Sequence, residues 1–232
     1  MQPLELYIHI PFCVKKCAYC DFLSGPAGEK EKEEYVKMLV DEIRNCPDTV
    51  QNYRVISIFF GGGTPSLLTG EQIGRLMDTV REIFTLDEDA EITMEMNPGT
   101  VTEEKLRKYR QAGVNRLSIG LQSVNDEELR LLGRIHTYEE FREAYHLARA
   151  NGFSNINVDL ISAIPGQTVE SWRRTLEQVM ALSPEHISAY SLILEEGTTF
   201  YKKYVEDEAK EGPKLPDEDA ERQMYWDTET LM

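Results

Sequence analysis

The sequence lacks any long apolar run. No stretch approaches the roughly 18 apolar residues that a membrane span needs, and no basic segment leads into an apolar one at the N-terminus, as in a secretory signal. We therefore expect a cytoplasmic protein with no membrane span. At 232 residues and 41% apolar content, the chain is long enough to bury one substantial core, so we expect a single domain over residues 1–232.

Positive charge is also scarce. Lys and Arg number 25 against 41 Asp and Glu, which gives a formal net charge of −16. A surface with this balance repels the phosphates of nucleic acids. We therefore expect no nucleic acid among the partners.

Cysteine is rare, and its placement is informative. Of the four cysteines, three lie in the run Cys13-Val-Lys-Lys-Cys17-Ala-Tyr-Cys20. In a chain with no export signal, such crowding indicates reduced thiols that bind a soft metal. Iron-sulfur clusters usually take four thiolates, so a loop with three leaves one iron without a protein ligand. That iron is then open to a small molecule as its fourth ligand.

The alternative is a structural zinc site, which needs four protein ligands. The nearby candidates for the fourth place are His9 and Cys46. Cys46 is spaced with Tyr35, Leu39 and Ile43 like one face of an amphipathic helix, which predicts a place in the core. His9 alternates with apolar neighbours, which is typical of a hydrogen-bonded packing residue. Because no second Cys or His pair follows at zinc-finger spacing, the pattern favours iron-sulfur over a zinc-stapled scaffold.

Short β-branched and apolar runs alternate with helical patterns along the chain, which predicts repeated βα units on a parallel sheet. The expected strands are Leu4–Ile10, Val55–Phe60, Glu91–Met96, Arg116–Leu121, Asn155–Ile161 and His186–Leu194. Six such units form either a partial (βα)6 barrel or a doubly wound sheet, and the residues by themselves leave both open.

Capping residues predict where the helices begin. The expected caps are Thr102, Asn125 (with Glu128), Thr137 (with Glu140) and Thr168, with a last helix from about Asp217. Gly113 and Gly152 are expected just past helix ends, the Thr168 helix is expected to end near Leu182, and Phe141, Ala144, Tyr145 and Ala148 are expected to form a buried stripe.

Unusual polar and glycine motifs follow the predicted strands at their carboxyl ends. They are the cysteine loop, Gly61-Gly62-Gly63-Thr64-Pro65, Glu95 with Asn97, Gly120 with Gln122, Asp159, and Tyr190 with Ser191. In parallel α/β folds this rim is where ligands bind. Glycines expose backbone N–H groups to a ligand, and a buried carboxylate such as Glu95 needs a partner. Arg134, taken alone, is expected on the surface.

The run Tyr7-Ile-His-Ile-Pro-Phe-Cys13 with the cysteine loop resembles the radical S-adenosylmethionine (SAM) superfamily, and within it the group around oxygen-independent coproporphyrinogen III oxidase. The similarity extends from Leu4 to about Leu231. It implies an α/β fold with a partial (βα)6 TIM-like barrel, and a [4Fe-4S] cluster held by Cys13, Cys17 and Cys20. It further implies that SAM ligates the fourth iron and that an electron donor drives SAM cleavage to methionine and a deoxyadenosyl radical, which is the cofactors' own chemistry.

The resemblance also implies which residues contact SAM. Gly62, Gly63 and Thr64 match the motif that meets the methionine amino group. Tyr7 and Tyr19 match aromatic positions near the cluster and the adenine. The remaining matches are polar: Glu95, Gln122, Arg134 and Asp159. At Ala163 relatives usually carry glycine, so a methyl group is expected to crowd the ligand side of the rim.

Within the group, Asp21-Phe22 departs from the oxidase, which carries a further cysteine two residues beyond the third. This form is similar to the HemW haem chaperones, which implies binding of haem or a porphyrin and its delivery to an acceptor protein. The alternative is coproporphyrinogen III oxidase activity, so whether the chain is an enzyme stays open. The haem-contacting His-Asn-x-x-Tyr-Trp motif of those chaperones does not occur here. Since the chain also stops inside the predicted last helix, we expect a C-terminal domain to be missing.

Overall fold

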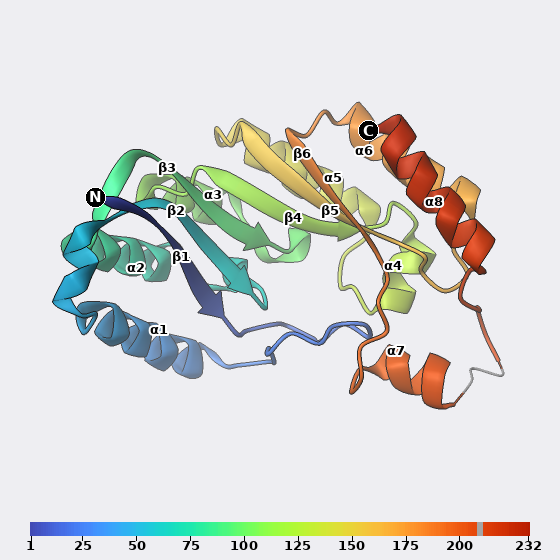
Figure 1. The fold of residues 1–232 in the computed structure, drawn as a ribbon, viewed down its shortest axis with the longest axis horizontal. Coiled ribbons are helices and arrows are strands. Elements are labelled where there is room, and N and C mark those ends of the chain that lie inside the picture. Colours follow the sequence, from blue (N-terminus) through green and yellow to red (C-terminus); the bar gives the residue numbers. More distant parts are fainter. Residues whose placement is uncertain (208–210) are drawn as a thin grey trace.

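Six parallel strands form one curved sheet with helices on its outer side (Figure 1). The structure is a computed structural model and describes residues 1–207 and 211–232. The strands are β1 (Gln2–Ile10), β2 (Tyr53–Gly62), β3 (Thr85–Met96), β4 (Arg116–Gln122), β5 (Asn155–Ser162) and β6 (His186–Ser191). All six predicted strands are therefore present.

The strand order decides between the two architectures that the residues left open. Each strand pairs with the one before and the one after it, in the order β1-β2-β3-β4-β5-β6. A doubly wound sheet reverses its order at a switch point, whereas a barrel adds strands in sequence. In the described residues β1 and β6 each pair with one neighbour, so the sheet is an open arc. The predicted α/β partial (βα)6 barrel of the radical SAM type is confirmed.

The first six helices lie between the strands in sequence, as βα units require, and the last two follow β6. The helices are α1 (Glu29–Arg44), α2 (Gly70–Ile83), α3 (Glu103–Ala112), α4 (Asp126–Leu132), α5 (Tyr138–Ala150), α6 (Val169–Ala181), α7 (Thr199–Tyr201) and α8 (Glu218–Leu231). Short 3-10 turns span Asp48–Asn52, Pro65–Leu67 and Pro98–Thr100, and a π-helical turn spans Lys202–Glu206.

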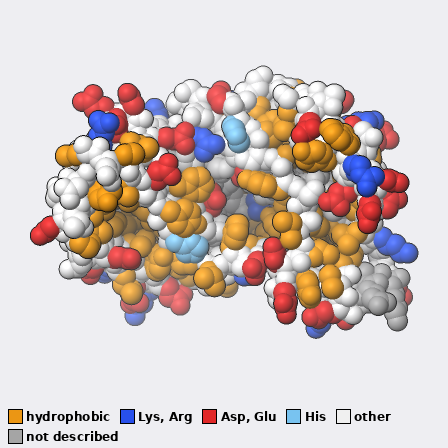
Figure 2. All heavy atoms as spheres, in the orientation of Figure 1, with side chains coloured by type: hydrophobic (Ala, Val, Ile, Leu, Met, Phe, Trp, Pro, Cys, Tyr) orange, Lys and Arg blue, Asp and Glu red, His pale blue; other side chains and the backbone are white. Residues whose placement is uncertain are grey.

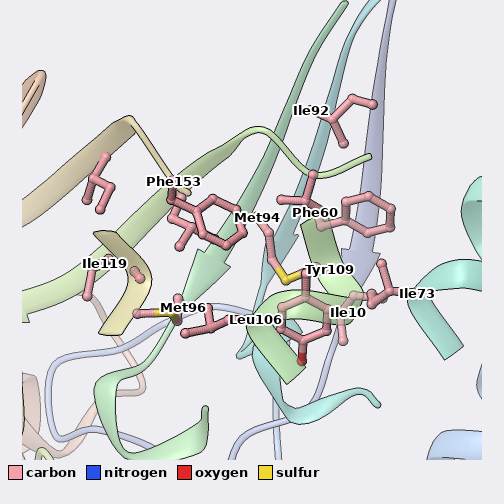
Figure 3. Packing of buried hydrophobic residues seen from close by; sticks show 14 of the residues in the cluster. Ile10, Phe60, Ile73, Ile92, Met94, Met96, Leu106, Tyr109, Ile119 and Phe153 are labelled. Carbon is pink, nitrogen blue, oxygen red and sulfur yellow. The ribbon is translucent and has the colours of Figure 1, made fainter. Parts of the chain in front are cut away.

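The main core lies between the convex face of the sheet and the helices. Alternate residues of each strand point outward and are buried, as Ile10, Phe60, Met94 and Ile119 show. Figure 3 shows these side chains facing residues of the helices α2 and α3, namely Ile73, Leu106 and Tyr109. Because side chains alternate along a strand, the intervening residues point to the concave face.

The concave face carries a row of polar residues. Strand register places Glu95, Ser118, Asn157 and His186 opposite one another on β3 to β6. On β2, Gly61 follows Phe60, which pairs with Met94 of β3, and Gly61 itself pairs with His9 of β1. Glu95, which was expected to bear chemistry, therefore faces the hollow of the arc.

The helix starts agree with the predicted caps. The side chains of Thr102, Thr137 and Thr168 each accept a backbone N–H of the following turn, as does Asp217 before α8. The predicted buried stripe of α5 is confirmed. Gly113 ends α3 with a φ of 106°, and the helix after Thr168 ends at Ala181, one residue before the expected Leu182.

One predicted cap forms only in part. Asn125 accepts the N–H of Glu127 and caps α4. Glu128 does not complete a reciprocal box, because its carboxylate is buried and accepts hydrogen bonds from Ser123 and Gln167 instead.

Other details depart from expectation. Strand β6 ends at Ser191 and not at Leu194, because its partner strand β5 ends at Ser162, which pairs with Ser191. Cys46 lies two residues beyond the end of α1, although it packs partly buried against the core as expected. The helix that ends at Ala150 closes on Asn151, and Gly152 follows with a φ of 84°.

No helix among residues 1–207 and 211–232 has the length and apolarity to cross a membrane.

Candidate functional site

The cysteine loop follows β1 and is tied to both sides of the arc. The Cys13 N–H donates to the Gly25 carbonyl at 2.9 Å, which closes the loop on itself. At the far side, Ala18 donates to the Leu132 carbonyl and accepts from the Phe200 N–H, both at 2.9 Å. The loop therefore connects β1 to the segments after α4 and β6, and backbone bonds determine its position.

The three thiols of the loop suit thiolate ligands. All three are free, half-buried and open to one cavity. The Thr64 hydroxyl lies 3.6 Å from the Cys13 sulfur, and an Arg134 Nη lies 3.9 Å from the Cys17 sulfur, so donors face two of the sulfurs. Burial raises the pKa of the Cys20 thiol, a cost that a bound metal would offset by replacing the proton.

The loop does not have the geometry of a single-ion site. In the described part of the chain, no three His, Cys, Asp or Glu side chains converge closely enough to hold one metal ion. Zinc needs all of its ligands about 2.3 Å from one centre. The thiolates of an iron-sulfur cluster bind different irons, so their sulfurs lie farther apart. Three thiolates on one short loop are a donor set that suits an iron-sulfur cluster with one iron left to another ligand.

Neither candidate for a fourth protein ligand is in a position to bind a metal at the cysteine loop. Cys46 lies before β2, at the amino-terminal edge of the sheet, whereas the cysteine loop follows the carboxyl end of β1. The His9 ring is engaged at both nitrogens, with the Tyr7 hydroxyl at 3.2 Å and the Leu23 carbonyl at 3.0 Å. His9 is thus the hydrogen-bonded packing residue that its neighbours predict.

The glycines after β2 allow the chain to pass close to β1. A Cβ at Gly63 would lie 2.6 Å from the Phe12 carbonyl oxygen, and one at Gly62 would lie 2.5 Å from the His9 ring. Gly62 also has a φ of 116°, which side chains rarely adopt. The glycines are therefore required for packing against the cysteine-bearing strand, in addition to any approach of a ligand.

Glu95 holds this glycine turn. Its carboxylate accepts the Gly62 N–H at 2.9 Å. Burial raises the pKa of Glu95 to about 7 and the charge of Asp159 adds to the rise, while the Gly62 bond opposes it. The expectation that Glu95 needs a partner is met by a backbone N–H. Its second oxygen remains available to the cavity.

Asp159 lies on the neighbouring part of the concave face. Its two oxygens accept hydrogen bonds from Ser118 at 2.9 Å and from Asn157 at 2.8 Å. Burial raises the pKa of Asp159, although these donors act in the opposite direction.

Gln122 and Arg134 meet at the end of β4. A bulge interrupts the register between Gly120 and Gln122, and Gln122 has a φ of 78°, a strained conformation for a residue with a side chain. Arg134 is not the surface residue that base rates favour. Its guanidinium donates to the Gly120 carbonyl at 2.6 Å, and its buried Nε has no protein partner. Burial raises the pKa of Tyr19, while the charge of Arg134 opposes the rise.

These residues surround one cavity of about 470 Å³, within the range of small-molecule sites. Its walls include eleven of the twelve residues that the resemblance assigns to the metal and SAM: Cys13, Cys17, Cys20, Tyr19, Gly62, Gly63, Thr64, Glu95, Gln122, Arg134 and Asp159. Figure 2 shows the molecule from the side of the strands, where charged side chains gather mainly toward the margins.

Two expected residues lie outside the lining. Tyr7 is 60% exposed, and its ring stacks on Phe59 at 6.1 Å. Ala163 is buried but does not line the cavity. Its φ of 58° shows that the alanine strains the backbone, because left-handed conformations favour glycine. The expected crowding of the ligand side is therefore wrong, and the cost of the methyl group is conformational.

Sequence reasoning missed several residues of the lining. Six further lining residues were expected on this rim, namely Lys15 and Lys16 of the cysteine loop with Asn97, Gly120, Tyr190 and Ser191. The residues that were missed are Asp21, Phe22, Met96, Ser118, Ile161, Leu192, Ile193 and Glu195. Ser118 stands two residues before Gly120 and so shares its face of the strand, a signal that strand alternation could have supplied.

Comparisons with known proteins identify the family of the chain. A model of the radical SAM superfamily matches residues 7–179. The chain is 44% identical over 98% of its length to the heme chaperone HemW of Escherichia coli strain K12, of which it covers 57%. It is 37% identical over 86% of its length to the mitochondrial radical S-adenosyl methionine domain-containing protein 1 of Danio rerio, of which it covers 45%.

Among solved structures, the coproporphyrinogen III oxidase HemN of Escherichia coli, described as a radical SAM enzyme, superimposes with a TM-score of 0.88. The identity is 33%, over 99% of this chain and 52% of that one. The chain thus spans about half the length of the relatives that it matches.

Proposed function

The chain belongs to the radical SAM superfamily, in the HemN and HemW-like group, and from this we propose that it holds a [4Fe-4S] cluster through Cys13, Cys17 and Cys20 and binds SAM in the adjoining cavity. The observation that carries the proposal is the placement of three free thiols, a glycine turn and two buried carboxylates around one cavity. Three soft ligands without a fourth leave a position for a non-protein ligand.

When bound and reduced, the cluster would supply the electron that cleaves SAM. The chain's own residues would bind and orient the cluster and SAM. Thr64 and Arg134 place donors near two of the sulfurs, which stabilises thiolate charge. Glu95 and Asp159 offer acceptors to the amino and hydroxyl groups of SAM.

Cluster binding is tested by anaerobic reconstitution followed by metal and sulfide analysis. We expect about four irons and four sulfides per chain, as the proposed cubane requires. One zinc and no sulfide would support a structural scaffold and contradict the proposal.

For the full protein we propose a HemW-type role, binding haem and delivering it to an acceptor protein. Two observations support this role: curated relatives named heme chaperone HemW match 98% of the chain, and Phe22 stands where the oxidase is expected to carry a further cysteine. The chain covers 57% of these relatives, so the role concerns a longer protein, in which an electron donor and haem are further partners.

Coproporphyrinogen III oxidation is the second candidate, because the HemN structure superimposes over 99% of the chain. The two functions are separated by giving the full-length reconstituted protein coproporphyrinogen III, SAM and a reductant, and by titrating it separately with haem. We expect haem binding without formation of protoporphyrinogen. Formation of protoporphyrinogen would establish the oxidase and overturn the chaperone proposal.

A further inference from the structure

Below the cavity, polar side chains on three strands form a network of which the proposed function uses only the Asp159 carboxylate. Ser118, Asn157 and His186 face one another in register on β4, β5 and β6, with Asp159 and Ser188 in the next row. Ser118 and Asn157 are 6% and 2% exposed. Burying polar side chains to this depth destabilises the fold unless every donor and acceptor is hydrogen-bonded.

The direction of each hydrogen bond follows from the chemistry of the Asn157 amide. Its Nδ2 donates to Ser118 Oγ and to Asp159 Oδ1, each at 2.8 Å, which uses both of its protons. Its Oδ1 therefore accepts, from Ser188 Oγ at 3.0 Å and from the Nδ1 of His186. An amide oxygen has no proton to give, so Nδ1 of His186 carries one.

The hydroxyl proton of Ser118 and one proton of the Asn157 amide consequently point toward Asp159. Ser118 Oγ accepts from Asn157 and donates to Asp159 Oδ2 at 2.9 Å. Asp159 thus receives one hydrogen bond on each oxygen from the sheet. Asp159 and Ser118 also line the cavity, so the remaining lone pairs of the carboxylate are available there.

We propose that Ser118 and Asn157 are positioning residues, which hold the Asp159 carboxylate as an acceptor for hydroxyl or ammonium groups of the ligand, with His186 as the solvent end of the chain of donors. The proposal rests on the proposed binding of SAM. In a network with a purely structural role, every donor and acceptor needs a hydrogen bond, but the bonds need not point toward any one group. Here both buried donors converge on a single carboxylate that lines the cavity.

The charged groups around Asp159 determine how ligand binding by its carboxylate depends on pH. Glu95 faces it from β3 and repels it, Arg116 on β4 attracts it, and His186 lies at the outer end on β6. Removal of a donor raises the pKa of Asp159, because its hydrogen bonds to Ser118 and Asn157 lower that pKa. The carboxylate is then ionised only at higher pH.

The test measures the Kd of SAM for the anaerobically reconstituted protein with its cluster oxidised, at pH 6 and pH 8.5. We compare wild type with Ser118→Ala and Asn157→Leu. Each is expected to weaken binding about tenfold at pH 6, the cost of about one charged hydrogen bond, and by less at pH 8.5. Glu95 titrates in wild type and in both variants alike, so its effect cancels when the Kd of each variant is divided by the wild-type Kd at the same pH.

Two variants serve as controls. Ser118→Thr retains the hydroxyl and is expected to bind like wild type. Ser162→Ala deletes a hydroxyl that is equally buried on β5 but does not line the cavity, and its Kd is expected to be unchanged. If Asn157→Leu fails to take up the cluster, the Kd of SAM for Ser118→Ala at the two pH values tests the proposal by itself.

The outcomes separate the two proposals. If wild type does not bind SAM, the proposed function fails. If wild type binds and Ser118→Ala binds equally well at both pH values, the positioning proposal is overturned. An equal loss at both pH values, shared by Ser162→Ala, would indicate a general packing effect and would overturn it as well.

Discussion

At the scale of single residues, the four cysteines divide into two classes. Cys13, Cys17 and Cys20 line the cavity, whereas Cys46 packs at the other edge of the sheet. Each Cys→Ala change in the loop is expected to abolish the cluster, since two thiolates cannot replace three. Cys46→Ala is expected to retain it. Iron and sulfide content with the absorbance of the reconstituted variants measures the difference, and loss of the cluster in Cys46→Ala would contradict the assignment.

Glu95 makes stability depend on pH. Its pKa rises from 4.5 to about 7 on folding, so the folded chain favours the protonated acid. The associated stability is complete below pH 4.5 and is lost as the pH rises through 7. A rise of this size corresponds to about 3 kcal/mol. Glu95→Gln retains an acceptor for the Gly62 N–H and cannot ionise.

We therefore expect Glu95→Gln to equal wild type in unfolding free energy near pH 4 and to exceed it by up to about 3 kcal/mol at pH 8. Anaerobic urea unfolding at both pH values measures this. Glu71→Gln serves as the control, because that carboxylate is exposed and its pKa is lowered by Lys108. A constant difference between Glu95→Gln and wild type across the range would refute the assignment.

At the scale of elements, α8 docks on α6 through one indole. Trp172 Nε1 donates to the Met224 carbonyl at 3.0 Å and to Thr228 Oγ1 at 2.9 Å, and the ring is fully buried. Trp172→Phe removes the donor and part of the ring. We expect a loss of about 2 kcal/mol in unfolding free energy and faster hydrogen exchange in α8.

Trp226→Phe is the matched control, because Trp226 lies on the outer side of α8 and is 54% exposed. Its effect is expected to stay within about 0.5 kcal/mol. If both variants lost the same stability, the indole hydrogen bonds would not anchor the helix.

At the scale of the whole molecule, the cysteine loop bridges the open arc. In Figure 1 it runs from the end of β1 to the region of α4 and α7, where Ala18 bonds to Leu132 and Phe200. A cluster bound to the loop would therefore order both ends of the arc at once. Reconstitution is expected to slow hydrogen exchange in residues 13–25 and 198–204 together, while α2 and α3 stay unchanged. Protection confined to the loop would contradict this bridging role.

Much of the fold is readable from short stretches of sequence. Thr102, Thr137 and Thr168 cap helices within a few residues of themselves, and the buried stripe of α5 follows from helical spacing. Such features depend on hydrogen bonds and periodicity inside one element. The end of β6 is different: it depends on where the partner strand β5 ends, some thirty residues earlier in the chain.

The sequence by itself determined the six strands, the cysteine loop and the residues that follow each strand. Only the tertiary structure decided that the strands run in order around an open arc, and that Ser118, Asn157 and Asp159 share one face. It also turned Arg134 inward to Gly120 and left Tyr7 outside the cavity. The reason is physical: local patterns fix which side of a strand a residue occupies, whereas strand order and register depend on packing between segments tens of residues apart.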